Sequence, residues 1–575
     1  MAPDPFLLTS HFCIEAAGHG ILNLAVPQAP GFPVYLTLKV IPLPTAECHP
    51  ITATPGMSRL FQDYCAGEPG ARRFYGGSEA FDWRRPAVPA HWAALVDILA
   101  EQNPGPAAAA SIEALRQGAG TVVTGQQVGL FGGPLFTAFK AATALARARE
   151  ATAAGQRHAG IFWLASEDHD FAEINHVTFP VRREFRKLVY EGARAVAVPV
   201  GGILLDGSIE PLLEQAGELI GYSDALEALS QAYQPGRTFG QAFAEFYARA
   251  FAAQGLLVLD AGGRNVHRLG APVLQAAMEQ ADELHAALLE RNGSLEAAGY
   301  HAQVAVASQS SLLFLLDRRT GARVALKRTP PSIAEPQGLW HAGRERCTTA
   351  DLVGILAAEP ERISPSALLR PVFQDFLLST SLTIGGPAEI AYFAQSQVVF
   401  DRILGRMTPV QPRMTATLVE PDVAELLRRH ELSLERVFAE TQDGLAQLLA
   451  ARALPIDGKR RLAAAGNALD GELNGLLDWM HAMDAGLGRS GDTAASKMRY
   501  QMNRLRRLAA NFQMQKEASL ARHAQAIHNA LFPGGHLQER VHGAAWYFAR
   551  HGFELAEMLV ERAGEACPGH VGLWL

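Results

Sequence analysis

The sequence predicts an α/β protein built on a mainly parallel, Rossmann-like sheet, with a helical coiled-coil domain toward its C-terminal end. Between about residues 90 and 330, short apolar runs such as TVVTG and HAGIFWLAS alternate with helical stretches. That order produces right-handed crossovers and parallel strands. The run AGIFWLA is apolar on both faces, as expected for a strand covered by helices on both sides. After about residue 415, long stretches rich in Leu, Ala, Arg and Glu predict extended helices.

The 575-residue chain is too long for a single core, so several structural segments are expected. The proline-rich residues 1–50 show no periodicity and predict an irregular extension. The stretches AQVAVASQSSLLFLLD and RRTGARVALKR predict a hairpin with its turn at Thr320 and Gly321. The other expected segments are a core at 51–415 with insertions at about 205–250 and 265–330, a coiled coil at 416–530, and a segment at 531–575 that returns to the core.

Composition and charge narrow the class of protein. The formal net charge is −7 and the pI is near 6.3, so no global positive field would attract nucleic acid. No apolar run is long enough to span a membrane and the N-terminal residues do not resemble a signal peptide, which favours a cytoplasmic protein. The five cysteines include no CxxC pair, so neither a structural zinc site nor a disulfide framework is expected.

Two apolar stripes characterise the helical region after residue 415. Their members recur every three or four positions, as in a coiled-coil hairpin. Each stripe covers only about two heptads, so an ordinary helical subdomain remains the alternative. The stripes consist of Leu473, Leu476, Met480, Met483 and Leu487, and of Met498, Met502, Leu505, Ala509 and Phe512.

The first site-like stretch is TGQQVGLFGGPLFTAFK, at the end of a predicted strand. Gly125 and Gly129 would let the backbone approach a ligand closely, and the following helix would offer its positive end to an anion. Gln126 and Gln127 would orient a polar ligand, and Lys140 would reach the site if its helix face turns that way. The spacing matches neither dinucleotide-binding nor Walker motifs, so a turn required only for packing is the alternative.

The second stretch, SEDHDFAEINH, places four ionisable side chains directly after a buried strand. Glu167, Asp168, His169 and Asp170 would perturb one another, and one of them could act as a general base. The alternative is a metal site, because His169, Glu173 and His176 would share a face if a helix ran through the stretch. The remaining polar residues, Asn175 and His176, would bind substrate or simply brace the loop.

The third stretch is SPSALLRPVFQDFLLSTSLTIGGPAEIAYFAQ. Arg370 offers a fork for a carboxylate or phosphate, with Gln374 one turn further along. Gly385 and Gly386 predict a second tight strand-to-helix turn, and Glu389 lies in the first turn of the next helix. Two such turns in one sheet would face the same cleft.

Together with FPGGHLQER near the C-terminal end, these stretches resemble the BshC family, assigned as the cysteine ligase of bacillithiol biosynthesis. The resemblance extends from about residue 55 to the end of the chain and implies connective-peptide insertions in a Rossmann-like core. It also implies a coiled coil that pairs two subunits, and a reaction that joins L-cysteine to the amine of glucosaminyl-malate.

Such a ligase needs an activated carboxylate, so ATP is the suspected cosubstrate, although the sequence contains no nucleotide-binding signature. No metal is expected. Under this hypothesis Asp168 or His169 would accept the amine proton, and Glu167 and Asp170 would bind hydroxyls or the ammonium group. Arg370 and Lys140 would bind malate carboxylates or phosphate. Two other hypotheses remain open: a non-catalytic assembly factor, and a metal-assisted hydrolase.

Overall fold

Five parallel strands form the central sheet, in the order β15-β14-β4-β5-β8, which confirms the predicted fold class. The computed structural model describes residues 21–25, 35–39, 45–76, 82–83, 86–181, 184–192, 197–331, 338–516 and 518–575. The five strands are β4 (Gly120–Gln127), β5 (His158–Ala165), β8 (Leu257–Asp260), β14 (Leu382–Gly385) and β15 (Val410–Pro412).

Helices cover both faces of this sheet. Along β5, Phe162 and Leu164 join one apolar cluster, and Ile161 and Trp163 join another on the opposite face. Burial of each such side chain contributes about 1.5–3 kcal/mol relative to exposure. The first cluster includes α5 (Phe136–Ala153) and α9 (Phe239–Ala250); the second includes α3 (Trp92–Gln102), α4 (Pro106–Arg116), α10 (Arg264–Glu279) and α13 (Arg370–Leu378).

The strand register brings the three site-like stretches to one edge of the sheet. Gly125 of β4 is level with Trp163 of β5, and Thr124 of β4 is level with Ile384 of β14. The carboxyl ends of these strands therefore lie side by side, where ligands bind in open parallel sheets. The helices that follow β5 and β14 are α6 (Phe171–Ile174) and α14 (Pro387–Ile403).

The second insertion contains the predicted hairpin. Strands β9 (Ser310–Leu316) and β10 (Arg323–Thr329) pair antiparallel around the expected turn. They belong to a five-stranded sheet of order β12-β11-β10-β9-β13, which extends beyond residue 330. Its other strands are β11 (Leu339–Ala342), β12 (Glu345–Cys347) and β13 (Ile363–Pro365), and the insertions also contain α7 (Ile209–Ile220), α8 (Asp224–Ala232), α11 (Ala281–Ala297) and α12 (Thr349–Ala358).

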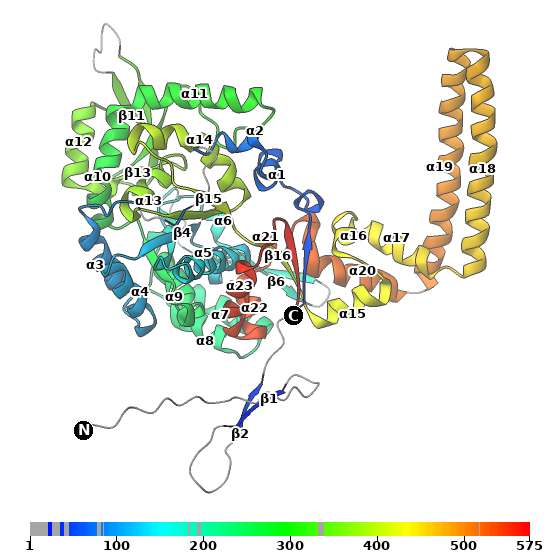
Figure 1. Ribbon diagram of the computed structural model, residues 1–575, viewed down its shortest axis with the longest axis horizontal. Coiled ribbons are helices and arrows are strands. Elements are labelled where there is room, and N and C mark those ends of the chain that lie inside the picture. The colour runs from blue at the N-terminus through cyan, green and yellow to red at the C-terminus, as the bar shows by residue number, and fades with distance from the viewer. Residues whose placement is uncertain are drawn as a thin grey trace, which may run out of the picture.

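A long helical hairpin projects away from the core (Figure 1). It consists of α18 (Ile456–Met483) and α19 (Ala485–Lys516), as the apolar stripes predicted. Leu473 is buried in the hairpin, but Leu476 and Leu505 are at least half exposed. The hairpin thus leaves much of its apolar stripe uncovered. Shorter helices at its base are α15 (Pro421–His430), α16 (Leu434–Phe438), α17 (Gln442–Ala453) and α20 (Ala518–Leu531).

Both ends of the chain contribute to one small sheet of order β16-β17-β3. The C-terminal strand β17 (His570–Trp574) is parallel to β16 (Thr415–Val419) and antiparallel to β3 (Ala46–His49). The helix α23 (Glu554–Gly564) packs against α5 of the core. Other elements outside the central sheet are α1 (Arg59–Cys65), α2 (Pro69–Arg72), β6 (His176–Val181), β7 (Glu184–Val189), α21 (Gln538–Val541) and α22 (Ala544–His551).

The N-terminal extension is more regular than expected. Strand β1 (Ile21–Ala25) pairs antiparallel with β2 (Tyr35–Lys39), and β3 joins the small sheet. Apart from these strands and residues 45 and 50, the rest of residues 1–50 lies outside the described part of the chain. Pairing of β1 with β2, and of β3 with β17, gives these segments an order that the proline-rich composition did not indicate.

The expectation of no disulfide was wrong, because Cys48 and Cys567 are bonded. Cys48 lies on β3, opposite Val571 of β17, so the antiparallel pairing brings the two cysteines together. They are separated by 519 residues, and their spacing in the sequence gave no indication of this proximity. Within the described residues, no helix has the length and apolar character needed to cross a membrane.

Candidate functional site

A cavity of about 740 Å³ opens at the carboxyl ends of the central strands. The core wall and the second insertion enclose it between them. Eleven of the residues singled out from the sequence line it: Gly125, Gln126, Gln127, Lys140, Glu167, Asp168, His169, Glu173, Arg370, Gly386 and Glu389. Six others do not line it: Gly129, Asp170, Asn175, His176, Gln374 and Gly385.

Asp168 is held in place from two sides. One carboxylate oxygen, Oδ1, accepts a hydrogen bond from the backbone N–H of His169 at 2.7 Å. The other, Oδ2, accepts from the side-chain amide of Gln127. Gln127 thus orients a carboxylate of the protein, where the sequence had suggested a direct role in ligand binding. These bonds fix the Asp168 carboxylate at the cavity wall.

The imidazole ring of His169 has a nitrogen atom without a hydrogen-bond partner among the described residues. This atom, Nδ1, is 3.6 Å from Oδ1 of Asp168. The side chain is 37% exposed and lines the cavity. An imidazole beside a fixed carboxylate is a common arrangement for accepting a proton near neutral pH.

Asp170, Asn175 and His176 serve the loop rather than the cavity, whereas Glu173 lines the cavity. The Asp170 carboxylate accepts from the N–H of Glu173 at 3.2 Å and caps α6. The Asn175 amide donates to the carbonyl oxygen of Tyr190 at 3.1 Å, which braces β6 against the following strand. The helix ends at Ile174 and His176 begins β6, so the helical face proposed for a metal site does not form. No group of three or more His, Cys, Asp or Glu side chains suited to a metal ion occurs among the described residues.

Lys140 joins the two strand-to-helix turns. Its ammonium group donates to the carbonyl oxygen of Gly125 at 2.7 Å and to Oε1 of Gln126 at 2.8 Å. It also contacts the carboxylate of Glu389, which in turn accepts from the N–H of Gly386 at 2.8 Å. Burial lowers the pKa of Lys140 to about 8, although the neighbouring Glu389 raises it. Three acceptors surround the ammonium, so it supports the wall more than it offers a free charge.

Arg370 is the cation with capacity to bind a ligand. Nη1 donates to Gln374 at 3.1 Å and Nη2 donates to the hydroxyl of Tyr392. Glu389 lies 3.8 Å from Nη2, a distance that provides only a loose ion pair. The sequence-derived role of Gln374 is therefore indirect, because it orients Arg370 from behind the cavity wall. Tyr392, one helical turn after Glu389, was missed although that spacing places both on one face of α14.

The glycine-rich turn after β4 is held by packing and by hydrogen bonds within the protein. A Cβ on Gly129 would lie 2.9 Å from Cα of Gly133, so the turn needs glycine for packing. The hydroxyl of Tyr233 accepts from the N–H of Gly132 and donates to the carbonyl oxygen of Gly129. Leu135, at the start of α5, donates to the carbonyl oxygen of His542 at 2.8 Å. Protein acceptors therefore already engage the N–H groups of Gly132 and Leu135.

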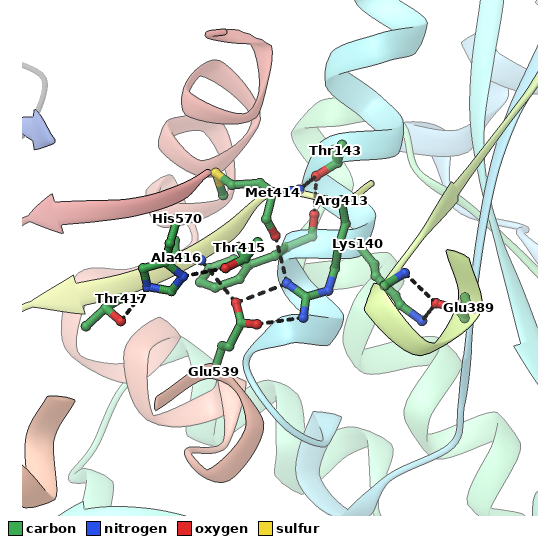
Figure 2. A network of polar contacts seen from close by, with 12 residues as sticks. Lys140, Thr143, Glu389, Arg413, Met414, Thr415, Ala416, Thr417, Glu539 and His570 are labelled. Carbon is green, nitrogen blue, oxygen red and sulfur yellow. Dashed lines mark hydrogen bonds and ion pairs between the residues drawn. The ribbon is translucent and has the colours of Figure 1, made fainter. Parts of the chain in front are cut away.

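Arg413 and Glu539 extend the site into a buried polar network that sequence reasoning missed (Figure 2). Arg413 lines the cavity, and its Nη1 and Nη2 donate to the two carboxylate oxygens of Glu539 at 3.0 and 2.6 Å. Glu539 also accepts from the N–H of Ala416 at 3.0 Å. Figure 2 shows the contact between Lys140 and Glu389 beside this pair. The C-terminal segment thus supports the cavity wall directly.

Arg323 brings the second insertion into the site. It lies on β10, lines the cavity, and stacks with its guanidinium carbon 3.9 Å from the ring centre of Phe314. Its Nε donates to Ser364 at 2.9 Å and its Nη2 to the carbonyl oxygen of Pro365 at 2.8 Å. The hairpin pattern predicted the strand, but no local signal marked this arginine as part of a site.

Comparison with known proteins agrees with the two-part architecture. Residues 45–414 match the family described as "Bacillithiol biosynthesis BshC, N-terminal Rossmann-like domain", and residues 416–570 match "Bacillithiol biosynthesis BshC, C-terminal coiled-coil domain". The chain belongs to the BshC family. Relatives named "Putative cysteine ligase BshC" occur in Koribacter versatilis, 40% identical over 91% of this chain and 98% of the relative, and in Solibacter usitatus, 34% identical over 90% and 97%. A third, from Geobacillus kaustophilus, is 31% identical over 78% of this chain and 84% of the relative.

Membership of the BshC family confirms the resemblance drawn from the motifs. The family descriptions print bacillithiol biosynthesis and a coiled-coil domain, and the relatives carry the name of a cysteine ligase. The sequence had predicted the domain and a ligase of this pathway. All residues that line the cavity except Arg540 lie in the Rossmann-like part of the match, and Arg413 is near the end of that part. Glu539 comes from the coiled-coil part, so the two matched regions meet at the cavity wall.

Proposed function

We propose that the protein joins the carboxyl group of L-cysteine to the amine of glucosaminyl-malate and so forms bacillithiol. The observation that carries this proposal is the presence of both signs of charge in one cavity. The carboxylates of Glu167 and Asp168 line it together with the guanidinium groups of Arg370 and Arg323. An amine on a sugar and the carboxylates of malate and cysteine are the complementary charges. The names of the BshC relatives support the same substrate class.

The His169 side chain is the best-placed proton acceptor. An amine must lose a proton before it can attack a carboxyl carbon, and the partly exposed imidazole of His169 lines the cavity. Asp168 has both carboxylate oxygens engaged by protein donors, so its role is to orient His169 and stabilise the positive charge that develops on the ring. The amine nitrogen then forms a C–N bond with the carboxyl carbon of cysteine. The bond between that carbon and its activated oxygen breaks, and the oxygen departs with the activating group.

ATP is the cosubstrate that fits the proposal. A free carboxylate reacts too slowly with an amine in water, and ATP would supply the activation. The residue that fits an anionic phosphate is Arg370, which lines the cavity. The turn after β4 and the start of α14 are weaker candidates, because Tyr233 engages Gly132 and Glu389 engages Gly386.

The uncovered stripe on the hairpin supports pairing of two subunits. Leu476, Trp479, Met483 and Leu505 are between 50% and 60% exposed along α18 and α19. Exposed apolar rows of this kind are uncommon on monomeric soluble proteins and are covered in coiled-coil assemblies. A second copy of the same hairpin offers the matching surface.

The proposed reaction is tested by incubating the purified protein with cysteine, glucosaminyl-malate and ATP and measuring bacillithiol by mass spectrometry. Each component is omitted in turn. Product that requires all three is the expected result. Absence of product from folded protein would contradict the ligase proposal and favour a non-catalytic assembly role. Product without ATP would retain amide formation but contradict the proposed activation.

A further inference from the structure

A buried histidine lies directly behind the acidic run. His267, on α10, is fully shielded from solvent and does not line the cavity. Its Nε2 atom is 2.9 Å from Oε1 of Glu167, whose side chain is 16% exposed. Glu167 therefore reaches from the cavity wall to a group that no substrate can touch. The sequence pattern did not connect these two residues, which are 100 positions apart.

The other side of the imidazole fixes its protonation pattern. Nδ1 is 2.9 Å from the carbonyl oxygen of Ile363. A carbonyl oxygen can only accept, so Nδ1 carries a proton. Two unprotonated atoms at 2.9 Å would repel each other, so a second proton belongs to this pair of groups. Nε2 lies at ion-pair distance from Glu167 and makes no hydrogen bond of good geometry among the described residues.

The surroundings favour the charged form of this pair. Three carboxylates act on His267: Glu167 after β5, Asp260 at the end of β8, and Glu361 before β13. On α13, the neighbouring Phe373 presents only an aromatic ring, 5.5 Å from the imidazole centre. Burial by itself lowers the pKa of His267. The charge of Glu167 and its contact with the ring act in the opposite direction with a larger combined effect, so the pKa of His267 is raised.

The backbone around Glu167 is built to hold it close to α10. Asp260 accepts from the hydroxyl of Ser166 and from the N–H of Gly262 at 3.0 Å, which ties the end of β5 to the loop after β8. A Cβ on Gly262 would lie 2.9 Å from Oγ of Ser166 and 3.6 Å from Cγ of Glu167. Only glycine lets this loop pass so near, and α10 then begins within reach of Glu167.

We propose that His267 is a positioning residue, which fixes the side chain of Glu167 through one carboxyl oxygen and leaves the second oxygen for the amine or hydroxyl groups of the substrate. The proposal rests on the proposed ligase function for its consequence in catalysis. The charged pair itself does not depend on that function. A cavity-facing carboxylate with a fixed rotamer binds a cation or hydroxyl without first losing side-chain freedom.

The pair is tested by NMR on full-length protein labelled with ¹⁵N-histidine. His267→Gln identifies the His267 signals among those of the 19 histidines. The expected result is an imidazolium at neutral pH in the wild type and a neutral ring in Glu167→Gln. A neutral ring in the wild type, or an unchanged charge in Glu167→Gln, would overturn the proposal. Because no turnover is measured, this result stands whether or not the ligase reaction is found.

Matched variants test the consequence for substrate. Gln at position 267 can place an amide donor where Nε2 lies, whereas Asn can replace only the Nδ1 donor. We expect His267→Asn to raise KM for glucosaminyl-malate about tenfold or more, with His267→Gln closer to the wild type. Equal KM values in the wild type and His267→Asn would overturn the positioning role. Circular dichroism and thermal melting check that each variant folds. If His267→Asn does not fold, Glu167→Gln tests the same pair from its other side and should also raise KM for glucosaminyl-malate.

Discussion

Arg413 and Glu539 form a two-pronged ion pair that is almost completely shielded from solvent, with exposed side-chain fractions of 2% and 0%. Removing one charge from such a pair leaves the other buried without a partner. We therefore expect Glu539→Gln to lower the free energy of unfolding by about 3–5 kcal/mol, measured by urea denaturation.

The matched control is Glu425→Gln, which removes an exposed partner of Arg428 on α15. This change should cost less than about 1 kcal/mol, because exposed ion pairs contribute little. Similar losses in the two variants would contradict the structural importance assigned to the buried pair.

Lys140 should make stability depend on pH in the alkaline range. Its pKa is lowered by burial from 10.5 to about 8, so between these values the unfolded chain binds the proton more tightly than the folded protein. Stability therefore rises with pH through this window. Relative to Lys140→Met, the wild type should gain about 2 kcal/mol between pH 7.5 and 9.5.

Denaturation of both proteins across this pH range measures the difference. Groups common to both proteins titrate equally and cancel. A difference that stays constant with pH, or that falls as pH rises, would contradict the lowered pKa of Lys140.

The hairpin stripe should control the oligomeric state. Trp479→Asp places a charge in the middle of the exposed apolar row, where a second hairpin would cover it. We expect the mass in solution, measured by light scattering, to fall from twice the chain mass to the single-chain value of 61.9 kDa. Tyr222→Asp, at a side chain 93% exposed on the core, should leave the mass unchanged. A wild-type monomer, or a dimer that survives Trp479→Asp, would argue against pairing through this stripe.

The parts of the fold that could be predicted are those with strong local patterns. Strand β5 is apolar on both faces, and the hairpin of β9 and β10 has a clear turn signal. The edge of the sheet where ligands bind follows from parallel strand order, so the acidic run could be placed in the site from sequence. The distinction between Asp168 in the cavity and Asp170 as a helix cap depends on where α6 begins, which the sequence did not specify.

Other parts of the site depend on contacts between distant segments. Arg413 and Glu539 are 126 residues apart, and each is unremarkable in its own stretch of sequence. In the glycine turn, Tyr233 and His542 satisfy backbone groups from separate segments, which the motif did not indicate. A motif can indicate that a backbone turns tightly, but the partners that occupy the turn are known only once the chain has folded.

The measurement that tests the central claim most directly is bacillithiol formation by the matched variants Asp168→Asn and Asp170→Asn. Both changes remove one charge and conserve shape, but Asp168 lines the cavity beside His169 whereas Asp170 caps α6 outside it. We expect Asp168→Asn to reduce the rate at least about 100-fold and Asp170→Asn, in which asparagine can still cap the helix, to retain most of it. Undiminished product from folded Asp168→Asn would contradict the assignment of this cavity as the site of amide formation.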